Sequence, residues 1–343
     1  MDEVRGVDVP QVTAWMAEHV PDLSPPLRFD LIAGGHSNMT FKVTDAAGSR
    51  VVLRRPPLDH VLPTAHDMGR EHKIISALGP TPVPVPAALG FCPDPDVNGA
   101  PFYVMGYVDG HVLHDGGVAQ RVYDEAQRRR LGLHFIDVLA DLHAVDVDAV
   151  GLSDLARKEG YIARQLKRWY SQFQQSKTRE VPAVDEVHET LAARIPEQGP
   201  ASVVHGDYRL GNCLSTDDGQ IAAVLDWEIC TLGDPLADVG YVLSTWPHPD
   251  EGDDPRAGSP SMVPGFPRRE EMLERYATRS GRDVSLIDYY TAFSLWKSAC
   301  IVEGVYSRYL GGALGETDVQ FDRFKNQVEM VANRARDAVS RLE

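Results

Sequence analysis

The sequence predicts an α+β fold, in which a small antiparallel sheet precedes a larger and mainly helical part. Two observations support this prediction. Short apolar runs alternate with glycine- and proline-rich turns through residues 28–108, which is typical of strands joined by tight connections. From residue 126 onward, long stretches place apolar side chains at helical spacing. We therefore expect residues 1–108 to form an N-terminal lobe with a leading helix and a hinge, and residues 109–343 to form a C-terminal lobe.

The elements of the first lobe follow from spacing and turn residues. Residues 9–23 carry apolar side chains at helical spacing and predict the leading helix. Two apolar stretches within residues 28–43 flank a glycine turn and predict a hairpin, and residues 50–57 begin as a further strand. Residues 66–78 have helical spacing, and residues 101–110 combine an apolar strand with a glycine-flanked turn that suits a hinge.

The second lobe is predicted to be built on two long apolar helices. Residues 126–145 form the first, in which His143 reads as a satisfied core histidine, and residues 289–309 form the second. Residues 152–196 predict a charged helical insertion, and residues 246–267 a proline- and glycine-rich loop of the length seen in lids or mobile linkers. Lys297 lies within an apolar stretch, so we expect it to pair with a carboxylate, preferably one of the protein rather than one of a substrate.

One motif carries most of the chemistry. The chain contains His205-Gly206-Asp207-Tyr208-Arg209-Leu210-Gly211-Asn212, and Asp226 follows behind an apolar run. The pattern H-x-D-x-x-x-x-N with a second Asp on the next strand has the spacing of a kinase-type phosphotransfer centre. We predict that Asp207 deprotonates a substrate hydroxyl and that Asn212 and Asp226 hold Mg²⁺ against the phosphates of ATP.

A polar hairpin is the simpler interpretation of that motif, because Asp and Asn are ordinary turn residues. Two upstream residues favour phosphotransfer, because they occur in kinase order. Arg54 ends a strand where protein kinases place a phosphate-binding Lys, and Glu71 stands early in the next helix as its natural partner. Arg can bind phosphate through two hydrogen bonds, although it is not geometrically equivalent to Lys.

Two further segments complete the predicted nucleotide site. The glycine turn would cover the phosphates with its N–H groups, and it comprises Gly34, Gly35, His36, Ser37 and Asn38. This turn matches neither the Rossmann nor the P-loop pattern, so a plain β-hairpin is an equal alternative. The hinge would bind adenine through the backbone of Gly106, Tyr107 and Val108, with Met105 packed against the ring or in the core.

Together these motifs resemble the aminoglycoside phosphotransferase/choline kinase-like family. The resemblance is closest to the branch whose kinase-like domain is fused to some acyl-CoA dehydrogenases. It spans about residues 28–240 and rests on Gly-Gly-His-Ser-Asn (34–38), Val-Leu-Arg-Arg-Pro-Pro (52–57), Arg-Glu (70–71), Phe-Tyr-Val-Met (102–105), the motif at 205–212, Leu-Asp-Trp-Glu (225–228) and Gly-Asp-Pro-Leu-Ala-Asp (233–238).

The resemblance implies a two-lobed protein-kinase-like fold, ATP or GTP with Mg²⁺, and transfer to a hydroxyl of a small molecule. It also implies that Arg54 and Glu71 form the phosphate clamp and that Arg209 acts near the γ-phosphate. Asp234 and Asp238 would brace the catalytic loop. Whether Glu228 contributes to the metal site stays open at this point.

Composition limits the partners and the location. The net charge is −16 and the pI is near 5.2, which argues against nucleic acid or an anionic membrane as a partner. The first residues lack a secretion signal, and no apolar run reaches the length of a membrane span. The 4 cysteines show no metal spacing. We therefore expect a cytoplasmic protein with reduced thiols, whose oligomeric state the sequence leaves open.

The predicted function is an ATP- and Mg²⁺-dependent small-molecule O-kinase. The resemblance to the dehydrogenase-fused branch suggests a hydroxy acid or hydroxyacyl acceptor ahead of an aminoglycoside. The main alternative is a nucleotide-binding pseudokinase with a regulatory role and no transfer activity. A metal hydrolase is a more distant alternative, because the sequence offers no second cluster of ligands.

Overall fold

The computed structural model describes residues 4–33, 38–58, 66–251, 258–311 and 321–342. The chain divides into two compact units, which differ from the predicted lobes in that the chain crosses between them several times. The first unit comprises 1–113, 148–153 and 211–229, and the second comprises 114–147, 154–210 and 230–343. The predicted metal ligands therefore belong to the first unit and the predicted base to the second.

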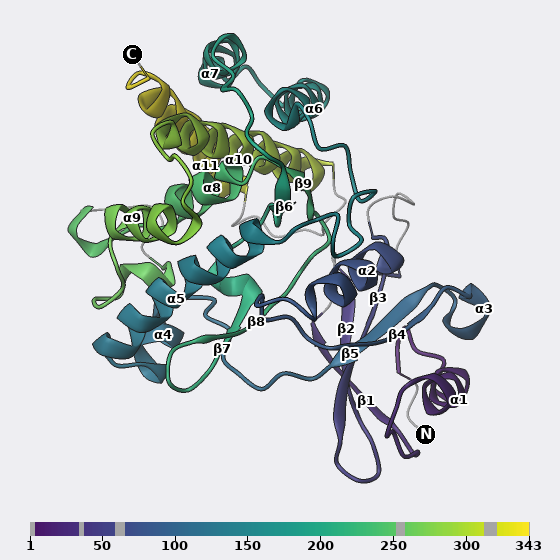
Figure 1. Ribbon diagram of the computed structural model, residues 1–343. Coiled ribbons are helices and arrows are strands. Elements are labelled where there is room, and N and C mark those ends of the chain that lie inside the picture. The colour runs from purple at the N-terminus through teal and green to yellow at the C-terminus, as the bar shows by residue number, and fades with distance from the viewer. Residues whose placement is uncertain (1–3, 34–37, 59–65, 252–257, 312–320, 343) are drawn as a thin grey trace. The chain divides into compact units, whose positions relative to one another are not determined.

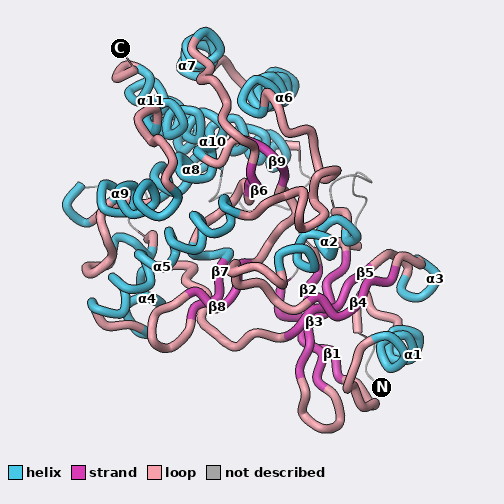
Figure 2. The backbone as a smooth tube through the Cα atoms, viewed as in Figure 1, coloured by secondary structure: helices cyan, strands magenta, loops and turns pink. Residues whose placement is uncertain are grey.

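The first unit contains the predicted antiparallel sheet (Figure 1). Its strands are β1 (Arg28–Ala33), β2 (Met39–Thr44), β3 (Arg50–Arg55), β4 (Ala88–Cys92) and β5 (Phe102–Gly106). They are ordered β1-β2-β3-β5-β4, and every neighbouring pair is antiparallel. The predicted hairpin and the two later strands are confirmed. Figure 2 shows the five strands as adjacent magenta segments.

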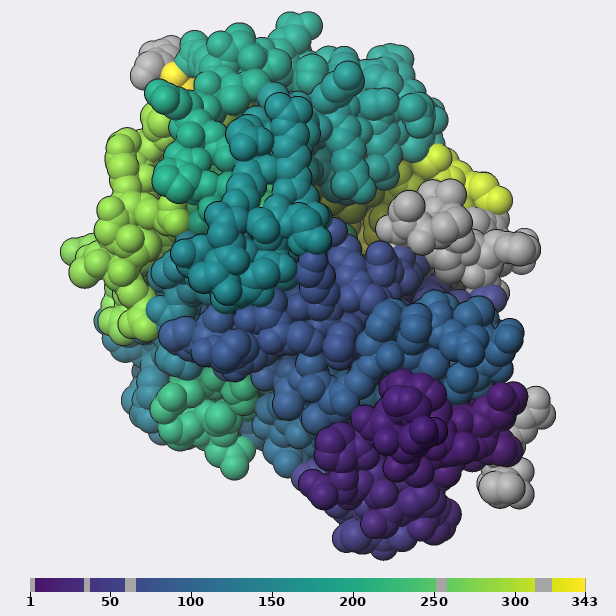
Figure 3. Space-filling model, turned by 45° about the vertical axis from the view of Figure 1, so that its right-hand side comes forward, coloured from purple at the N-terminus to yellow at the C-terminus, as the bar shows by residue number. Residues whose placement is uncertain are grey.

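Helices cover both faces of this sheet. Strand side chains alternate between the two faces, so each face can bury apolar residues under a helix. Val12 and Met16 of α1 (Val9–His19) belong to the same buried cluster as Phe41 and Leu53 of the sheet. Tyr103, next to Phe102 of that cluster, points to the opposite face, where α2 (Met68–Leu78) packs on β4 and β5. Figure 3 shows the α1 segment, in purple, on the outside of this unit. The short helix α3 (Pro95–Asn98) lies against α1.

A second hairpin joins the first unit from later in the chain. It consists of β7 (Cys213–Ser215) and β8 (Ile221–Val224), which pair antiparallel. Ser215 exchanges two backbone hydrogen bonds with His111, of 2.8 and 2.9 Å, and the N–H of Val224 donates to Pro84 at 2.8 Å. These bonds fix the strand that delivers Asp226 to the same unit as the five-stranded sheet.

The second unit is mainly helical, as predicted. Its helices are α4 (Gly116–Val122), α5 (Glu125–Ala144), α6 (Tyr161–Ser176), α7 (Pro182–Ala193), α8 (Leu236–Thr245), α9 (Arg269–Ser280), α10 (Ile287–Leu310) and α11 (Phe321–Val339). Two short strands, β6 (Ser202–Val204) and β9 (Thr231–Gly233), pair antiparallel. Among the described residues, no helix combines the length and apolarity needed to cross a membrane.

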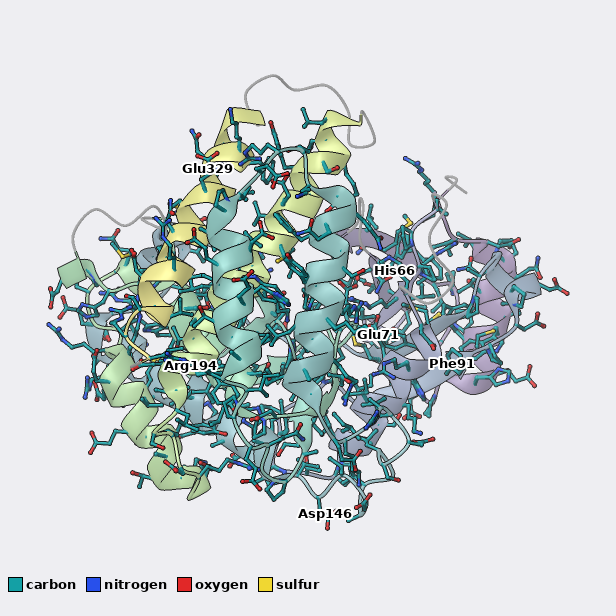
Figure 4. All side chains as sticks on the ribbon, turned by 90° about the horizontal axis from the view of Figure 1, so that it is seen from above. His66, Glu71, Phe91, Asp146, Arg194 and Glu329 are labelled. Atoms are coloured by element: carbon teal, nitrogen blue, oxygen red, sulfur yellow. The ribbon has the colours of Figure 1, made fainter. Side chains whose placement is uncertain are left out.

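Helix α10 is the centre of this unit and packs on α6, α7, α8 and α11. Figure 4 shows α6 and α7 side by side, with α10 and α11 next to them. Helix α8 approaches α10 very closely at Gly240, where an added Cβ would lie 2.5 Å from the backbone of Tyr290. Glycine is therefore required at this crossing, because any side chain would push α8 away from α10.

The described ends of the long loop at 246–267 are anchored within the second unit. Trp246 donates from its ring nitrogen to the carbonyl of Pro267 at 3.0 Å, and buried Arg128 of α5 donates to the carbonyl of Pro264 at 2.7 Å. Asp250 of this loop pairs with Arg268. Asp253 and Asp254 lie outside the described residues.

Candidate functional site

Arg54 connects two predicted site residues of the first unit. Its Nη2 donates to Asp226 Oδ1 at 2.6 Å, and its Nε lies 3.0 Å from Glu71 Oε2 at ion-pair distance, without hydrogen-bond alignment. The register of β3 places Arg54 directly opposite Tyr103 of β5. Burial opposes the charge of Arg54, but Glu71, Tyr103 and Asp226 outweigh it and raise the pKa of the guanidinium above its ordinary value. Arg54 therefore stays a cation at this position.

Glu71 is held on three sides within the same unit. Besides Arg54, Tyr103 donates its hydroxyl at 3.0 Å and Asn38 donates its amide at 2.8 Å. Burial raises the pKa of Glu71, although Arg54, Tyr103 and Asn38 oppose that shift. The predicted pairing of Arg54 with Glu71 is present, and Asn38 is the described residue of the glycine turn that reaches it. Gly34, Gly35, His36 and Ser37 lie outside the described residues.

Glu228 lies beside this clamp. Its Oε2 is 3.4 Å from the amide nitrogen of Asn38 and 4.0 Å from Arg54 Nη2. His66 Nδ1 is 3.9 Å from the same oxygen, and burial, with the charge of Arg54, lowers the pKa of this imidazole. Figure 4 labels His66 and Glu71 in this part of the molecule. Arg54, His66 and Asn38 therefore surround one carboxylate that the sequence left without a role.

Asp226 and Asn212 have a donor set that fits Mg²⁺. Both offer side-chain oxygens, and Mg²⁺ is usually bound by one or two protein oxygens together with phosphate and water. The carbonyl of Asn212 accepts from the N–H of Leu225 at 2.8 Å, which ties the two segments together. Asp226 has φ 65°, a left-handed conformation that costs a non-glycine residue about 1–2 kcal/mol. The described residues contain no cluster of three or more His, Cys, Asp or Glu that could bind a metal by itself.

The predicted hinge is fixed by its own neighbours. The N–H of Gly106 donates to Ala87 at 2.8 Å, so this donor is already used, and the adenine contact of Tyr107 and Val108 stays a prediction. Arg50 lies 4.5 Å from the centre of the Tyr107 ring and forms two hydrogen bonds with Asp109, of 3.0 and 2.7 Å. Met105 is buried on β5 opposite Val52, so it is at least a core residue of the sheet.

In the second unit, Asp238 braces the predicted catalytic loop. Its carboxylate accepts from the N–H groups of His205 and Gly206, at 2.6 and 2.8 Å, and His143 Nε2 lies 3.4 Å away. Burial opposes its ionisation, but His143, His205 and the Gly206 N–H outweigh burial and lower the pKa of Asp238. Asp234 instead accepts from the hydroxyl of Tyr290 at 2.6 Å. The core role predicted for His143 is confirmed.

The structure adds Tyr241 to the environment of Asp207. The hydroxyl of Tyr241, on α8, donates to Asp207 Oδ1, and Arg209 Nε lies 3.4 Å from Oδ2. Burial and the nearby Asp207 carboxylate raise the pKa of Tyr241 well above its ordinary value. Tyr208 fixes the loop from the other side, because its buried hydroxyl donates to the Phe135 carbonyl of α5 at 2.8 Å. The sequence gives no local signal for Tyr241, which lies 34 residues beyond Asp207.

Comparison with known proteins agrees with this arrangement. The family described as "Phosphotransferase enzyme family" matches residues 28–282. The chain belongs to this family. A Ralstonia eutropha crystal structure, provisionally named an aminoglycoside phosphotransferase, superimposes with a TM-score of 0.81 at 31% identity and covers 97% of this chain and 98% of its own. The predicted resemblance and the predicted protein-kinase-like fold class are therefore confirmed.

More distant structures share the fold alone. The ADP-bound aminoglycoside phosphotransferase APH(2'')-Ib has a TM-score of 0.59 at 14% identity, covering 97% of this chain and 99% of its own. The macrolide 2'-phosphotransferase MphH of Brachybacterium faecium has a TM-score of 0.60 at 21% identity, covering 94% and 97%. At these identities the likeness concerns backbone architecture, and residue roles do not follow from it.

The curated relatives are longer proteins named as acyl-CoA dehydrogenases. Acyl-CoA dehydrogenase family member 10 of Mus musculus is 34% identical over 298 residues, which are 86% of this chain and 27% of that protein. Family member 11 of Rattus norvegicus is 32% identical over 318 residues, which are 89% of this chain and 40% of that protein. The chain thus spans well under half the length of these relatives.

Proposed function

We propose that this family member is an ATP- and Mg²⁺-dependent phosphotransferase that moves the γ-phosphate to a hydroxyl of a small molecule. The observation that carries the proposal is the Arg54 ion-pair chain in the first unit. It brings together Glu71, Arg54 and Asp226, which are separated by up to 172 residues in sequence. Arg54 is a buried cation between two carboxylates, and one of these, Asp226, has a strained backbone conformation. A purely structural role would not require this combination.

In this proposal, Arg54 binds the phosphates of the nucleotide and Glu71 orients it. Nucleotide binding would draw Arg54 away from Asp226 and release that carboxylate for the metal, with Asn212 as the second protein ligand. Mg²⁺, when bound there, would neutralise charge that develops on the phosphates during transfer. ADP, ATP and GDP in structural relatives support a nucleotide site, and GTP is the second donor to test beside ATP.

Asp207 accepts the proton of the attacking hydroxyl. The brace from Asp238 and the bond from Tyr241 hold its carboxylate in one orientation, which limits the entropy lost on reaching the transition state. In this proposal Arg209, whose Nε lies 3.4 Å from Asp207 Oδ2, interacts with the transferred phosphoryl group.

For the acceptor, we propose a hydroxy acid or a hydroxyacyl compound rather than an aminoglycoside. The curated relatives are named for acyl-CoA chemistry, which supports an acceptor from the same chemical class. In the second unit, Lys297 lies 3.3 Å from the carbonyl of Gly206, next to the predicted base. A cation at the catalytic loop would repel a polycationic drug.

The test is Mg²⁺-dependent ADP release across hydroxy acids, hydroxyacyl-CoA thioesters, aminoglycosides, choline and sugars. Asp207→Asn is the control, because it removes the base and leaves the nucleotide clamp intact. We expect stimulation by hydroxy acids or their thioesters and no stimulation in the variant. Tight ATP binding without transfer to any acceptor would contradict the proposal and favour a regulatory module.

A further inference from the structure

Lys297 is a buried cation with an unusually small set of partners. It lies on α10 with 9% of its surface exposed, among side chains that are mostly apolar. Its Nζ makes one hydrogen bond, of 3.3 Å, to the carbonyl of Gly206, and lies 5.7 Å from the centre of the Trp169 ring. An ammonium group has three donors, and the described residues supply one long bond and one ring to them.

The sequence predicted that a protein carboxylate would pair with Lys297. Within the part of the chain that the structure describes, no carboxylate lies within the ion-pair distance of 4.0 Å from Nζ. Burial lowers the pKa of Lys297, and the more distant charges of Asp238 and Asp207 oppose that shift. The described residues therefore offer Lys297 a backbone carbonyl and no carboxylate partner, and an oxygen of the substrate is the alternative that we pursue.

The surroundings of Lys297 add a second and independent observation. Its hydrogen bond within the described residues is to the residue that precedes the predicted base Asp207, so the ammonium lies at the catalytic loop. Arg168 of α6 approaches the same Trp169 ring to 5.3 Å. A buried cation at this loop, in a chain whose net charge is −16, is suited to an anionic ligand there.

Arg308 does not share this place, although its charge would suit the same kind of ligand. It follows Lys297 by 11 residues on α10, and at 1.5 Å per residue this is about 16 Å along the helix axis. Its side chain is exposed. Arg308 is therefore a useful control, because its removal changes the net charge by the same amount on the same helix.

We propose that Lys297 binds an anionic oxygen of the acceptor and thereby selects hydroxy acids over neutral alcohols. This inference rests on the proposed function and names the residue that determines its specificity. The carboxylate of the acceptor would complete the hydrogen bonds of the ammonium, while its hydroxyl faces Asp207. The competing explanation is that Lys297 only ties α10 to the loop through Gly206, in which case it would affect all acceptors equally.

The experiment uses a series of hydroxypentanoates in which the hydroxyl stands on each carbon in turn. Each acid is compared with its amide, which keeps the hydroxyl and removes the charge. Transfer is measured as kcat/KM, and binding is measured by calorimetry on the nucleotide-free protein. The variants are Lys297→Met and Lys297→Gln, and Arg308→Met is the matched control. Thermal unfolding of each variant separates loss of fold from loss of recognition.

We expect the wild-type protein to prefer the best acid over its amide roughly 10- to 100-fold, the range for one charge-assisted hydrogen bond. Both Lys297 variants should remove this preference by lowering kcat/KM for the acid, while kcat/KM for the amide stays the same. Arg308→Met should keep the preference. Equal binding of acid and amide by the wild type, or an equal loss for both in the variants, would overturn the inference. Acid-selective binding without transfer to any acceptor would preserve the anion site and refute the proposed function.

Discussion

Tyr241→Phe tests whether the hydroxyl of Tyr241 positions the catalytic carboxylate. Phe keeps the ring that packs in α8 and removes only the donor to Asp207 Oδ1. Burial and Asp207 raise the pKa of Tyr241, so the wild-type hydroxyl keeps its proton at any pH near neutrality. The effect of the substitution should therefore be the same on both sides of neutral pH.

The magnitude follows from the environment of Asp207. A hydrogen bond to a charged group contributes about 1.5–3 kcal/mol, and each 1.4 kcal/mol changes a rate about tenfold. The side chain of Asp207 is 29% exposed, so water can replace part of the lost bond. We therefore expect the low end of the range, a decrease in kcat of roughly 10- to 30-fold with an unchanged affinity for ATP.

The assay is steady-state transfer to a fixed acceptor, with ATP affinity measured separately by calorimetry. Tyr289→Phe is the matched control, because it removes a buried hydroxyl that donates to the carbonyl of Leu191 at 2.9 Å in the same unit. The control should lose stability and keep kcat. The reasoning would be refuted if Tyr241→Phe kept full kcat, or if both variants lost kcat to the same extent.

Three further substitutions test other parts of the account. Because burial raises the pKa of Glu71, its carboxylate takes up a proton above the ordinary glutamate range as pH falls, which weakens the Arg54 clamp. The affinity of the wild type for ATP should therefore fall on mild acidification, and Glu71→Gln should bind ATP weakly at every pH. Titration calorimetry measures both, and a wild-type affinity that does not change with pH would contradict the prediction. Asp238→Asn should lower the free energy of unfolding by about 2–4 kcal/mol, since two N–H groups lose a charged acceptor. The folded pKa of Asp238 is lowered, so its contribution is complete above the ordinary value of 3.8 and is lost only as pH falls through the lower, folded pKa. A difference in unfolding free energy between wild type and variant, measured with denaturant, that already shrinks near neutral pH would contradict this prediction. Gly240→Ala should destabilise by about 1–3 kcal/mol, because its Cβ would lie 2.5 Å from the backbone of α10. Gly304→Ala, whose Cβ has no neighbour closer than 3.6 Å, should be neutral or stabilising in the same unfolding assay.

The sequence predicted the fold well where periodicity was strong. The long helices at 126–145 and 289–309 appear as α5 and α10 with ends shifted by one or two residues. The hairpin around the glycine turn appears as β1 and β2. These elements have one dominant pattern, either helical spacing or short apolar runs between turn residues, so local preference and burial agree.

The parts that the sequence did not predict depend on contacts between distant residues. Spacing alone cannot show that Tyr241 reaches Asp207, or that Lys297 meets the carbonyl of Gly206, 91 residues away in sequence. The loop at 246–267 looked mobile because of its proline and glycine content. The anchoring of its described end at Pro264 depends on Arg128, which is buried in α5 and has no local sequence signature.

Phosphorus NMR of the products formed from ATP, Mg²⁺ and the best acceptor tests the central claim most directly. The wild-type protein should form ADP and a phosphate ester of the acceptor in equal amounts. Asp207→Asn should form neither, while its affinity for ATP stays the same. Formation of ADP with free phosphate and no ester, or undiminished transfer by Asp207→Asn, would contradict the assignment of Asp207 as the base of a small-molecule phosphotransferase.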